Sequence, residues 1–157
     1  MRSLALSLLL VLLSLTTAYS QIPTNIGIQI LKAEDERRYD SVLENLMRSP
    51  DAAIRVRAAL AAGRVGDERA VPALSVLLEL DQPDQVQEMA AFALGEIESI
   101  KGAEPIFKRW NANEGERPSI SGAATKYSIR VRLVEAAGKI AASNPDAQGQ
   151  RTLATRY

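Results

Sequence analysis

The feature that most constrains the fold of this chain is an internal repeat. Residues 51–66 read DAAIRVRAALAAGRVG, and residues 129–140 return much of that text as IRVRLVEAAGKI. A more divergent copy, VQEMAAFALGEI, occupies residues 86–97. Self-similarity at a spacing of roughly 20 to 50 residues is typical of repeat architectures, in which each unit buries its apolar face against the next. The sequence therefore predicts a repeat protein.

Each copy has the pattern of an alanine-rich helix. In the first copy one helical face is formed by Ile54, Ala58, Ala61, Ala62 and Val65, and small side chains of this kind let a neighbouring helix approach closely. The spacing predicts this helix over residues 52–65, with Asp51 as its N-cap.

A glycine recurs at the same place in all three copies, as Gly63, Gly95 and Gly138. Glycine inside a helix costs about 1 kcal/mol relative to alanine. We therefore expect the backbone at each of these positions to be pressed against another helix.

The segments between the copies predict partner helices. One is expected to run from about Lys32 to Ser49, where Pro50 ends it. Another covers residues 68–80, with Pro72 bending it or delaying its start. The predicted fold class is all-α, a short α-solenoid of helical hairpins.

The first twenty residues have the pattern of a secretory signal peptide. Arg2 precedes an almost unbroken apolar run, and Ala18-Tyr19-Ser20 has the small-x-small form of a cleavage site. The run is short for a spanning helix, which needs about 20 apolar residues, although a retained membrane anchor is the alternative. We therefore expect an exported chain, periplasmic or secreted and bacterial, with no stable membrane insertion after cleavage.

Composition divides the rest of the chain into three parts, the second of which contains an insertion. Residues 21–31 are expected to form an extended or irregular leader, ordered only if it packs on the first helix, and residues 32–143 the repeat domain of about three repeats. A polar insertion near residues 111–128 reads as a plain loop extension or as a binding feature. Residues 144–157 are expected to be partial or frayed, either a weak cap or the start of further structure.

That C-terminal segment has few apolar side chains that could pack on the helix before it. We expect the small-residue face of Ala136, Ala137, Ile140 and Ala141 to need cover from a following helix. Residues 147–157 contain few large apolar side chains, so burial there would not offset the ordering of the backbone. The third repeat is therefore predicted to be the least stable.

Composition also excludes much chemistry. The chain has no Cys and no His, which excludes disulfides, His-dependent nucleophiles and zinc sites of the usual His/Cys type. It carries 19 basic and 19 acidic residues, so no charge excess points to nucleic acid. Two carboxylate pairs, Glu96 with Glu98 and Asp81 with Asp84, are better read as solvated or capping groups than as catalysts. We expect no enzyme activity, cofactor or metal.

Residues 51–74 follow the pattern D-x-x-[VI]-R-x-x-A-A-x-A-L-G-x-[IV]-G-D-x-R-A-V-P-x-L almost throughout. That pattern resembles the HEAT-like repeat of the phycobilisome-lyase type. The second copy departs from it, with Gln87 in place of Arg and Glu98 in place of Gly, which puts its polar helix contacts in doubt. The chain also resembles the N-terminal array of exported bacterial proteins that join such repeats to a cyclophilin-type peptidyl-prolyl isomerase. Its sequence has no segment of that isomerase type, so it would be the non-catalytic N-terminal portion of such a protein.

The resemblance implies that the second helix of each repeat lines a concave face, on which the variable positions point outward. This concave face carries apolar residues bordered by charged ones, as protein-binding surfaces do, so a protein or peptide partner is expected. The alternatives are that Phe92 and Leu60 pack on the neighbouring repeat and that the charges pair between helices. Arg55 and Arg130 are expected to bind turn carboxylates such as Asp67. We call the twelve variable positions the stripe: Val56, Arg57, Leu60, Arg64, Glu88, Met89, Phe92, Glu96, Val131, Arg132, Glu135 and Lys139.

Overall fold

A computed structural model describes residues 22–79, 81–112 and 123–145. In that part of the chain all regular structure is helical, as predicted. The elements are α2 (Thr24–Asp35), α3 (Ser41–Met47), α4 (Ala52–Val65), η1 (Glu68–Ala70), α5 (Val71–Leu77), α6 (Asp84–Ile97), η2 (Ile100–Gly102), α7 (Ala103–Ala112) and α8 (Ala123–Ser143).

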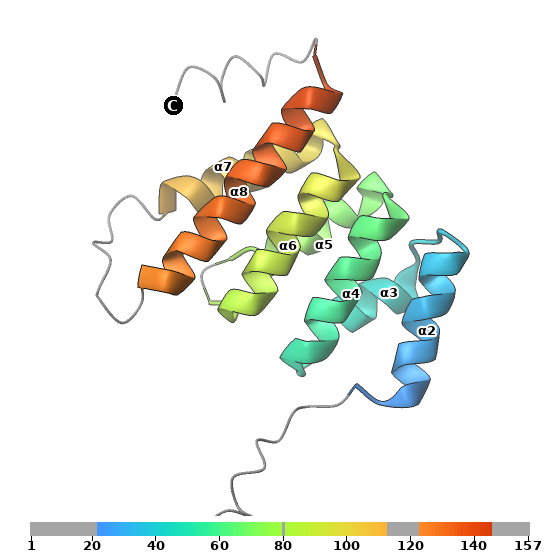
Figure 1. Ribbon diagram of the computed structural model, residues 1–157. Coiled ribbons are helices and arrows are strands. Elements are labelled where there is room, and N and C mark those ends of the chain that lie inside the picture. Colours follow the sequence, from blue (N-terminus) through green and yellow to red (C-terminus); the bar gives the residue numbers. More distant parts are fainter. Residues whose placement is uncertain (1–21, 80, 113–122, 146–157) are drawn as a thin grey trace, which may run out of the picture.

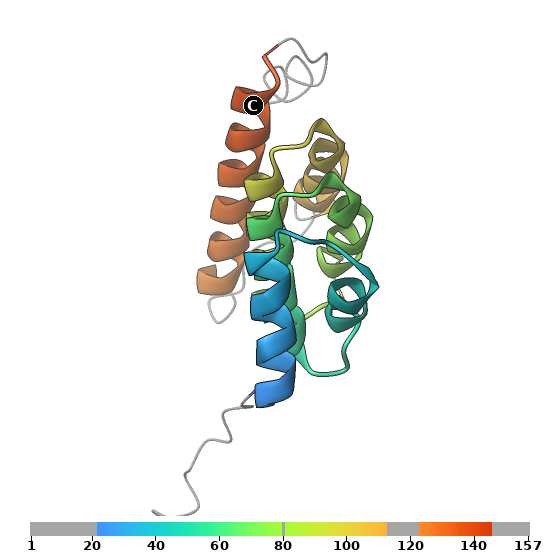
Figure 2. The same cartoon turned by 90° about the vertical axis from the view of Figure 1, so that its right-hand side faces the viewer.

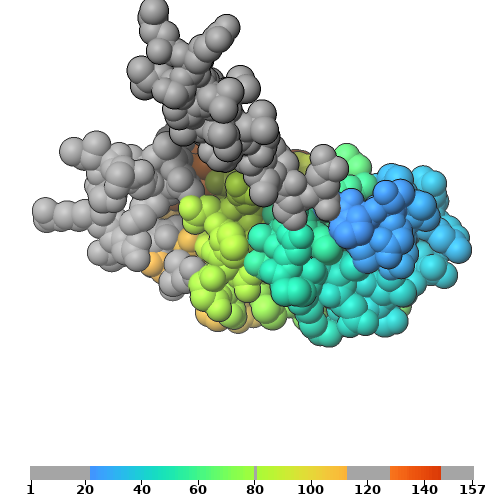
Figure 3. Space-filling view, turned by 90° about the horizontal axis from the view of Figure 1, so that it is seen from below, coloured from blue at the N-terminus to red at the C-terminus, as the bar shows by residue number. Residues whose placement is uncertain are grey.

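The helices form two layers. In Figure 1, α2, α4, α6 and α8 stand side by side in one layer, and α3, α5 and α7 lie behind them. Figure 2 shows the two layers edge-on, and Figure 3 shows the lower ends of α2, α4 and α6 in a row. The core fills the space between the layers, with Leu43, Leu74, Leu94 and Leu133 all fully buried. This stack of hairpins is an α-solenoid.

Local signals set the helix boundaries where the sequence predicted them. Asp51 caps α4 by accepting a 2.8 Å hydrogen bond from the backbone N–H of Ala53. Gly66 ends the helix with φ 75°, a left-handed conformation that glycine adopts without strain. The expected delay at Pro72 is confirmed, because the short η1 turn precedes α5 and the proline stands in the first turn of α5.

The prediction of an irregular leader over residues 21–31 is wrong for the described residues from Thr24 onward, which belong to α2. The reason is tertiary. Ile30 and Ala33 are buried and Ile26 packs against the same core, so α2 is stabilised by burial against the following repeat. It is the first member of the layer that α4, α6 and α8 continue.

The prediction of one helix from Lys32 to Ser49 is also wrong, because the helix is interrupted between α2 and α3. Arg37 there has φ 46°, and Asp40 caps α3 by accepting hydrogen bonds from the N–H groups of Val42 and Leu43 at 3.0 and 3.2 Å. The break lets α3 leave the first layer and begin the second.

The insertion predicted near residues 111–128 is shorter than expected, because α7 reaches Ala112 and α8 begins at Ala123. Its remainder, residues 113–122, lies outside the described residues, as do the predicted signal peptide (residues 1–20) and the segment 146–157, which holds most of the predicted frayed end. The face expected to need cover is already buried: Ala136, Ala137 and Ile140 are 2 %, 7 % and 0 % exposed, because α6, α7 and η2 pack on α8.

The recurrent glycines behave differently at the end of the array. A Cβ atom added at Gly63 would lie 2.8 Å from the Cα of Ala93, and one at Gly95 would lie 2.8 Å from the Cα of Ala136. The predicted close approach is confirmed at both. It is wrong at Gly138, where a Cβ would meet no atom of the described residues within 4 Å.

Candidate functional site

The stripe lies on α4, α6 and α8 of the first layer, and it is most exposed on α8. Its residues on α4 are half-buried apart from the exposed Arg64. On α6 only Glu96 is fully exposed. On α8 all four members are exposed: Val131, Arg132, Glu135 and Lys139.

The apolar members of the stripe fall into two groups. Val56 and Met89 pack against the hydrophobic core, so part of each side chain serves the fold. Leu60 and Phe92 are half-buried, and Val131 is exposed. The surface that a partner could reach is therefore built mainly on these last three.

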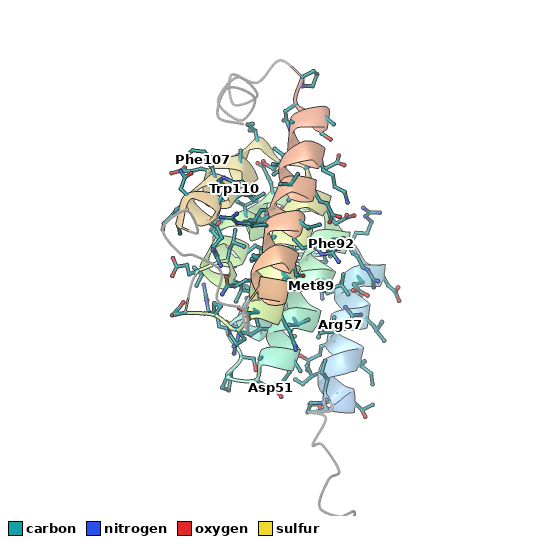
Figure 4. The ribbon with its side chains drawn as sticks, turned by 60° about the vertical axis from the view of Figure 1, so that its left-hand side comes forward. Asp51, Arg57, Met89, Phe92, Phe107 and Trp110 are labelled. Atoms are coloured by element: carbon teal, nitrogen blue, oxygen red, sulfur yellow. The ribbon has the colours of Figure 1, made fainter. Side chains whose placement is uncertain are left out.

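Phe92 sits between cations of the next helix. The guanidinium carbon of Arg132 lies 5.8 Å from its ring centroid, and the Nζ of Lys139 lies 5.3 Å away. Both are within reach of a cation–π attraction. Figure 4 shows Phe92 and Met89 on α6 close to α8. Phe92 thus contacts the neighbouring repeat, as one alternative supposed, and its ring still remains half-exposed.

Carboxylates pair with the cations of the stripe. Lys139 binds Glu96 on α6, and Arg132 donates to Glu135 at 2.9 Å on its own helix. Exposed pairs of this kind each contribute little to stability. Their main effect is to neutralise the charges of Arg132 and Lys139 beside Phe92.

Sequence reasoning missed Glu34, the residue that completes the stripe at its N-terminal end. Arg57 donates to both Glu34 oxygens, at 2.5 and 2.9 Å, and Arg64 donates at 3.4 Å. The Glu34 side chain is only 12 % exposed. The hydrogen bonds from Arg57 lower the pKa of the Glu34 carboxyl, although burial acts in the opposite direction. The helical spacing of Ile26, Ile30 and Ala33 is the sequence pattern that could have predicted α2.

This pair predicts a pH-dependent contribution to stability. A carboxyl whose folded-state pKa is lowered stabilises the fold above its unfolded pKa of about 4.5, and that stabilisation is lost as the pH falls through the folded value. We expect Glu34→Gln to lower the free energy of unfolding by about 1 to 3 kcal/mol at neutral pH, because it weakens charge-assisted bonds to Arg57. Urea denaturation should show that difference shrinking below pH 4.5.

Glu36→Gln is the matched control, because Glu36 is on the same segment in exposed pairs with Lys32 and Arg38. It should change stability by less than about 1 kcal/mol. Equal losses in the two variants, or a Glu34→Gln effect that persists unchanged at pH 3, would contradict the assigned role.

The two arginines expected to bind turn carboxylates have other contacts. Arg55 donates to the backbone oxygens of Ser49 and Pro50 at 2.6 and 3.0 Å, so its expected pairing with Asp67 is wrong. The bonds from Arg69 to Asp67 lower the pKa of that carboxyl instead. Arg130 lies over the ring of Trp110, 5.4 Å from its centroid.

The carboxylate pairs weighed as catalysts are not assembled into a site. Glu96 binds Lys139, whereas Glu98 accepts a 2.6 Å hydrogen bond from the Ser143 hydroxyl. Asp81 is exposed in the turn before α6, and Asp84 is exposed at the first position of that helix. The described residues contain no group of three metal-ligating side chains that could hold an ion.

None of the described helices is both long and apolar enough to cross a membrane.

A second surface, which the sequence did not predict, lies between α5 and α7. It is a cleft of about 480 Å³ that continues into another of about 360 Å³, and the two share Ser75, Pro105 and Lys108. An ion pair between Glu68 and Lys101, 2.8 Å long, stands at one end. The proline near the start of both α5 and α7, Pro72 and Pro105, was the available signal. The cleft belongs to the second layer and is separate from the stripe.

A family model described as HEAT repeats matches residues 39–120. The matched part includes the hairpins α3–α4 and α5–α6 and the helix α7, and so covers the helices that carry the first two copies of the motif. No curated protein matches the chain.

Proposed function

Because the chain belongs to the HEAT repeat family, we propose that it is a non-catalytic helical scaffold that binds a polypeptide partner on the stripe. Stacked helical repeats present extended surfaces of this kind to proteins. The observation that carries the proposal is Phe92, an aromatic side chain that stays half-exposed on a surface layer whose α4 and α6 expose no large hydrophobic residue fully.

The charge pattern supports an apolar contact with the partner. Arg57, Arg132 and Lys139 are engaged by carboxylates of this chain, so a partner would have to displace those carboxylates to use them. Leu60, Phe92 and Val131 have no such internal competitor. We therefore expect a partner segment with apolar anchors, such as an amphipathic helix, and an affinity that depends weakly on salt.

The test is selection of ligands from a random peptide library on the wild-type protein. Truncating a central aromatic anchor of an interface commonly costs 2 kcal/mol or more. We therefore expect Phe92→Ala to weaken the selected peptides by about thirtyfold or more in titration calorimetry, with Leu60→Glu at least as severe. The far-ultraviolet spectrum and melting temperature should stay near those of the wild type, because both side chains are only half-buried.

Val76→Ala is the matched control, since Val76 is 54 % exposed on α5 in the other layer. It should leave the affinity unchanged. Peptides that bind Phe92→Ala as tightly as the wild type would overturn the stripe as the binding site. Unfolding of both stripe variants would show instead that these side chains belong to the core.

Export of the protein is part of the proposal and rests on the pattern of residues 1–20. N-terminal sequencing of the protein purified from the cell envelope or culture medium should give a chain that begins near Gln21. Recovery of the chain with Met1 in place would contradict cleavage.

An alternative is that the chain forms the non-catalytic N-terminal portion of a longer exported peptidyl-prolyl isomerase. It is supported by the export pattern and by the likeness of the repeats and of the run ILKAEDERR at residues 30–38. The gene sequence downstream of the Tyr157 codon decides between the two, because the alternative requires an isomerase domain there.

A further inference from the structure

The large hydrophobic residues that the structure leaves exposed gather at the two ends of the first layer. In the described residues there are seven, and four of them belong to α2 and α8, while α4 and α6 have none. Figure 1 shows α2 and α8 as the outermost helices of the layer. The four residues and their exposed fractions are Ile28 (59 %), Leu31 (53 %), Val131 (37 %) and Val134 (50 %).

On α8 one of these valines, Val134, occupies a position that the earlier copies bury. Aligning the three copies places Val134 where α4 has Ala59 and α6 has Ala91, both of which are 0 % exposed. The same alignment places the open Gly138 where Gly63 and Gly95 receive the next helix. The outer surface of α8 is thus the surface through which α4 and α6 each bind their successor. We call Val131, Val134 and Gly138 the tail face.

On α2 the exposed pair lies away from the rest of the array. Ile30 and Ala33 face the core, whereas Ile28 and Leu31, three residues apart on another side of the helix, do not. A Cβ at Gly27 would meet nothing within 4 Å in the part of the chain that the structure describes, so the helix backbone is also accessible there. We call Gly27, Ile28 and Leu31 the head face.

We propose that copies of this chain associate head to tail, with the tail face of one copy against the head face of the next. The joint continues the inter-repeat packing, so that α2 of the second copy takes the place beside α8 that α8 takes beside α6. It buries both exposed apolar pairs. It also preserves the asymmetry of the internal contacts, in which the glycine of one helix receives a different surface of the following helix. A two-fold pairing of α8 with α8 would set Val134 against its own copy and leave α2 uncovered.

Heterologous contacts of this kind form rings or open chains of subunits. A contact made by one helix from each copy is small compared with the roughly 1,200 to 2,000 Å² of surface that a stable complex buries. We therefore expect reversible association at about 100 μM, a concentration at which such weak contacts are populated. The head and tail faces share only Val131 with the stripe. The proposal therefore does not depend on a partner binding to the stripe.

Sedimentation velocity on the full chain with Ile28→Glu and Val134→Glu variants tests it. Wild-type mass should rise with concentration, and each variant alone should stay monomeric, because each lacks one face. An equimolar mixture should form a one-to-one dimer, since Ile28→Glu keeps an intact tail face and Val134→Glu an intact head face. Val42→Glu, at a 44 % exposed position on α3, should associate like the wild type.

Cross-linking gives a second measurement that does not depend on the charged variants folding. The chain has no Cys, so oxidising an equimolar mixture of Ile28→Cys and Val134→Cys should yield disulfide-linked dimer well above the yield of either variant alone. A wild-type chain that is monomeric at every concentration would overturn the proposal. So would a result in which Val134→Glu is monomeric while Ile28→Glu associates like the wild type, which would indicate two-fold pairing through α8.

Discussion

Replacing Gly95 by alanine is expected to lower the free energy of unfolding by about 2 kcal/mol, and replacing Gly138 by alanine is expected to raise it by up to about 1 kcal/mol. The gain at Gly138 follows from helix propensity, because alanine is favoured over glycine by about that amount inside a helix and no described atom lies within 4 Å of the new methyl group. Gly95→Ala has the same gain in propensity but places its methyl carbon 2.8 Å from the Cα of Ala136.

The clash at Gly95 cannot be relieved by a rotamer change, because the nearest atom belongs to the backbone of α8. The two helices must move apart, and overpacking of this kind costs about 1 to 3 kcal/mol or more. Gly63→Ala should behave like Gly95→Ala, since its methyl group would meet the backbone of Ala93 at 2.8 Å. The opposite signs make Gly138 an internal control for the same substitution in the same motif.

Urea denaturation followed by circular dichroism measures all three variants. The midpoint should fall for Gly63→Ala and Gly95→Ala and should not fall for Gly138→Ala. If Gly138→Ala proves as destabilising as the other two, then α8 is covered in solution and its tail face is not open. Measuring at low protein concentration keeps self-association from contributing.

Replacing Gln87 by leucine is expected to cost about 2 to 4 kcal/mol of stability. Gln87 is 2 % exposed and Arg109, on α7, is 8 % exposed. The side-chain oxygen of Gln87 accepts from Arg109 Nε at 2.8 Å, and its amide nitrogen donates to the Gln82 backbone oxygen at 2.6 Å. Leucine removes both bonds and deprives a buried charged group and a carbonyl of a partner, which costs more than the loss of an exposed bond.

Two comparisons isolate that effect in urea denaturation. Gln85→Leu, at an exposed position on the same helix, should change stability by less than about 0.5 kcal/mol. Adding Arg109→Met to Gln87→Leu should recover part of the loss, because the buried charge is then gone. A midpoint for Gln87→Leu equal to that of the wild type would contradict a structural role for the pair.

The same residue explains how the second copy tolerates its departure from the repeat pattern. In the first copy Arg55 binds the backbone oxygens of Ser49 and Pro50 in the preceding loop. In the second copy Gln87 holds the corresponding carbonyl of Gln82 and leaves its oxygen free to accept from Arg109. Pattern matching could show that the residue type differs, but it could not identify Arg109 of the next repeat as the partner of the substituted side chain.

The sequence by itself determined the class of fold and the bounds of its central helix. Residues 52–65 were predicted as a helix and form α4 over Ala52–Val65, because Asp51 and Gly66 act on neighbouring backbone groups and need no tertiary contact. The repeat likewise required stacked helical hairpins, since one copy alone cannot bury its apolar face. The positions of the stripe on α4, α6 and α8 were implied by the resemblance to HEAT-like repeats, and helical spacing agrees that they share one face.

Only the tertiary structure decided what happens at the two ends of the array. The helix α2 contains Gly27 and has no side-chain cap at its N-terminus, so it depends on burial against the core and on the pair between Glu34 and Arg57. Gly138 lies in the same motif as Gly63 and Gly95, yet its surroundings differ because no described helix follows α8. Local sequence encodes the motif, whereas burial depends on which helix packs beside it, and that is a property of position in the array.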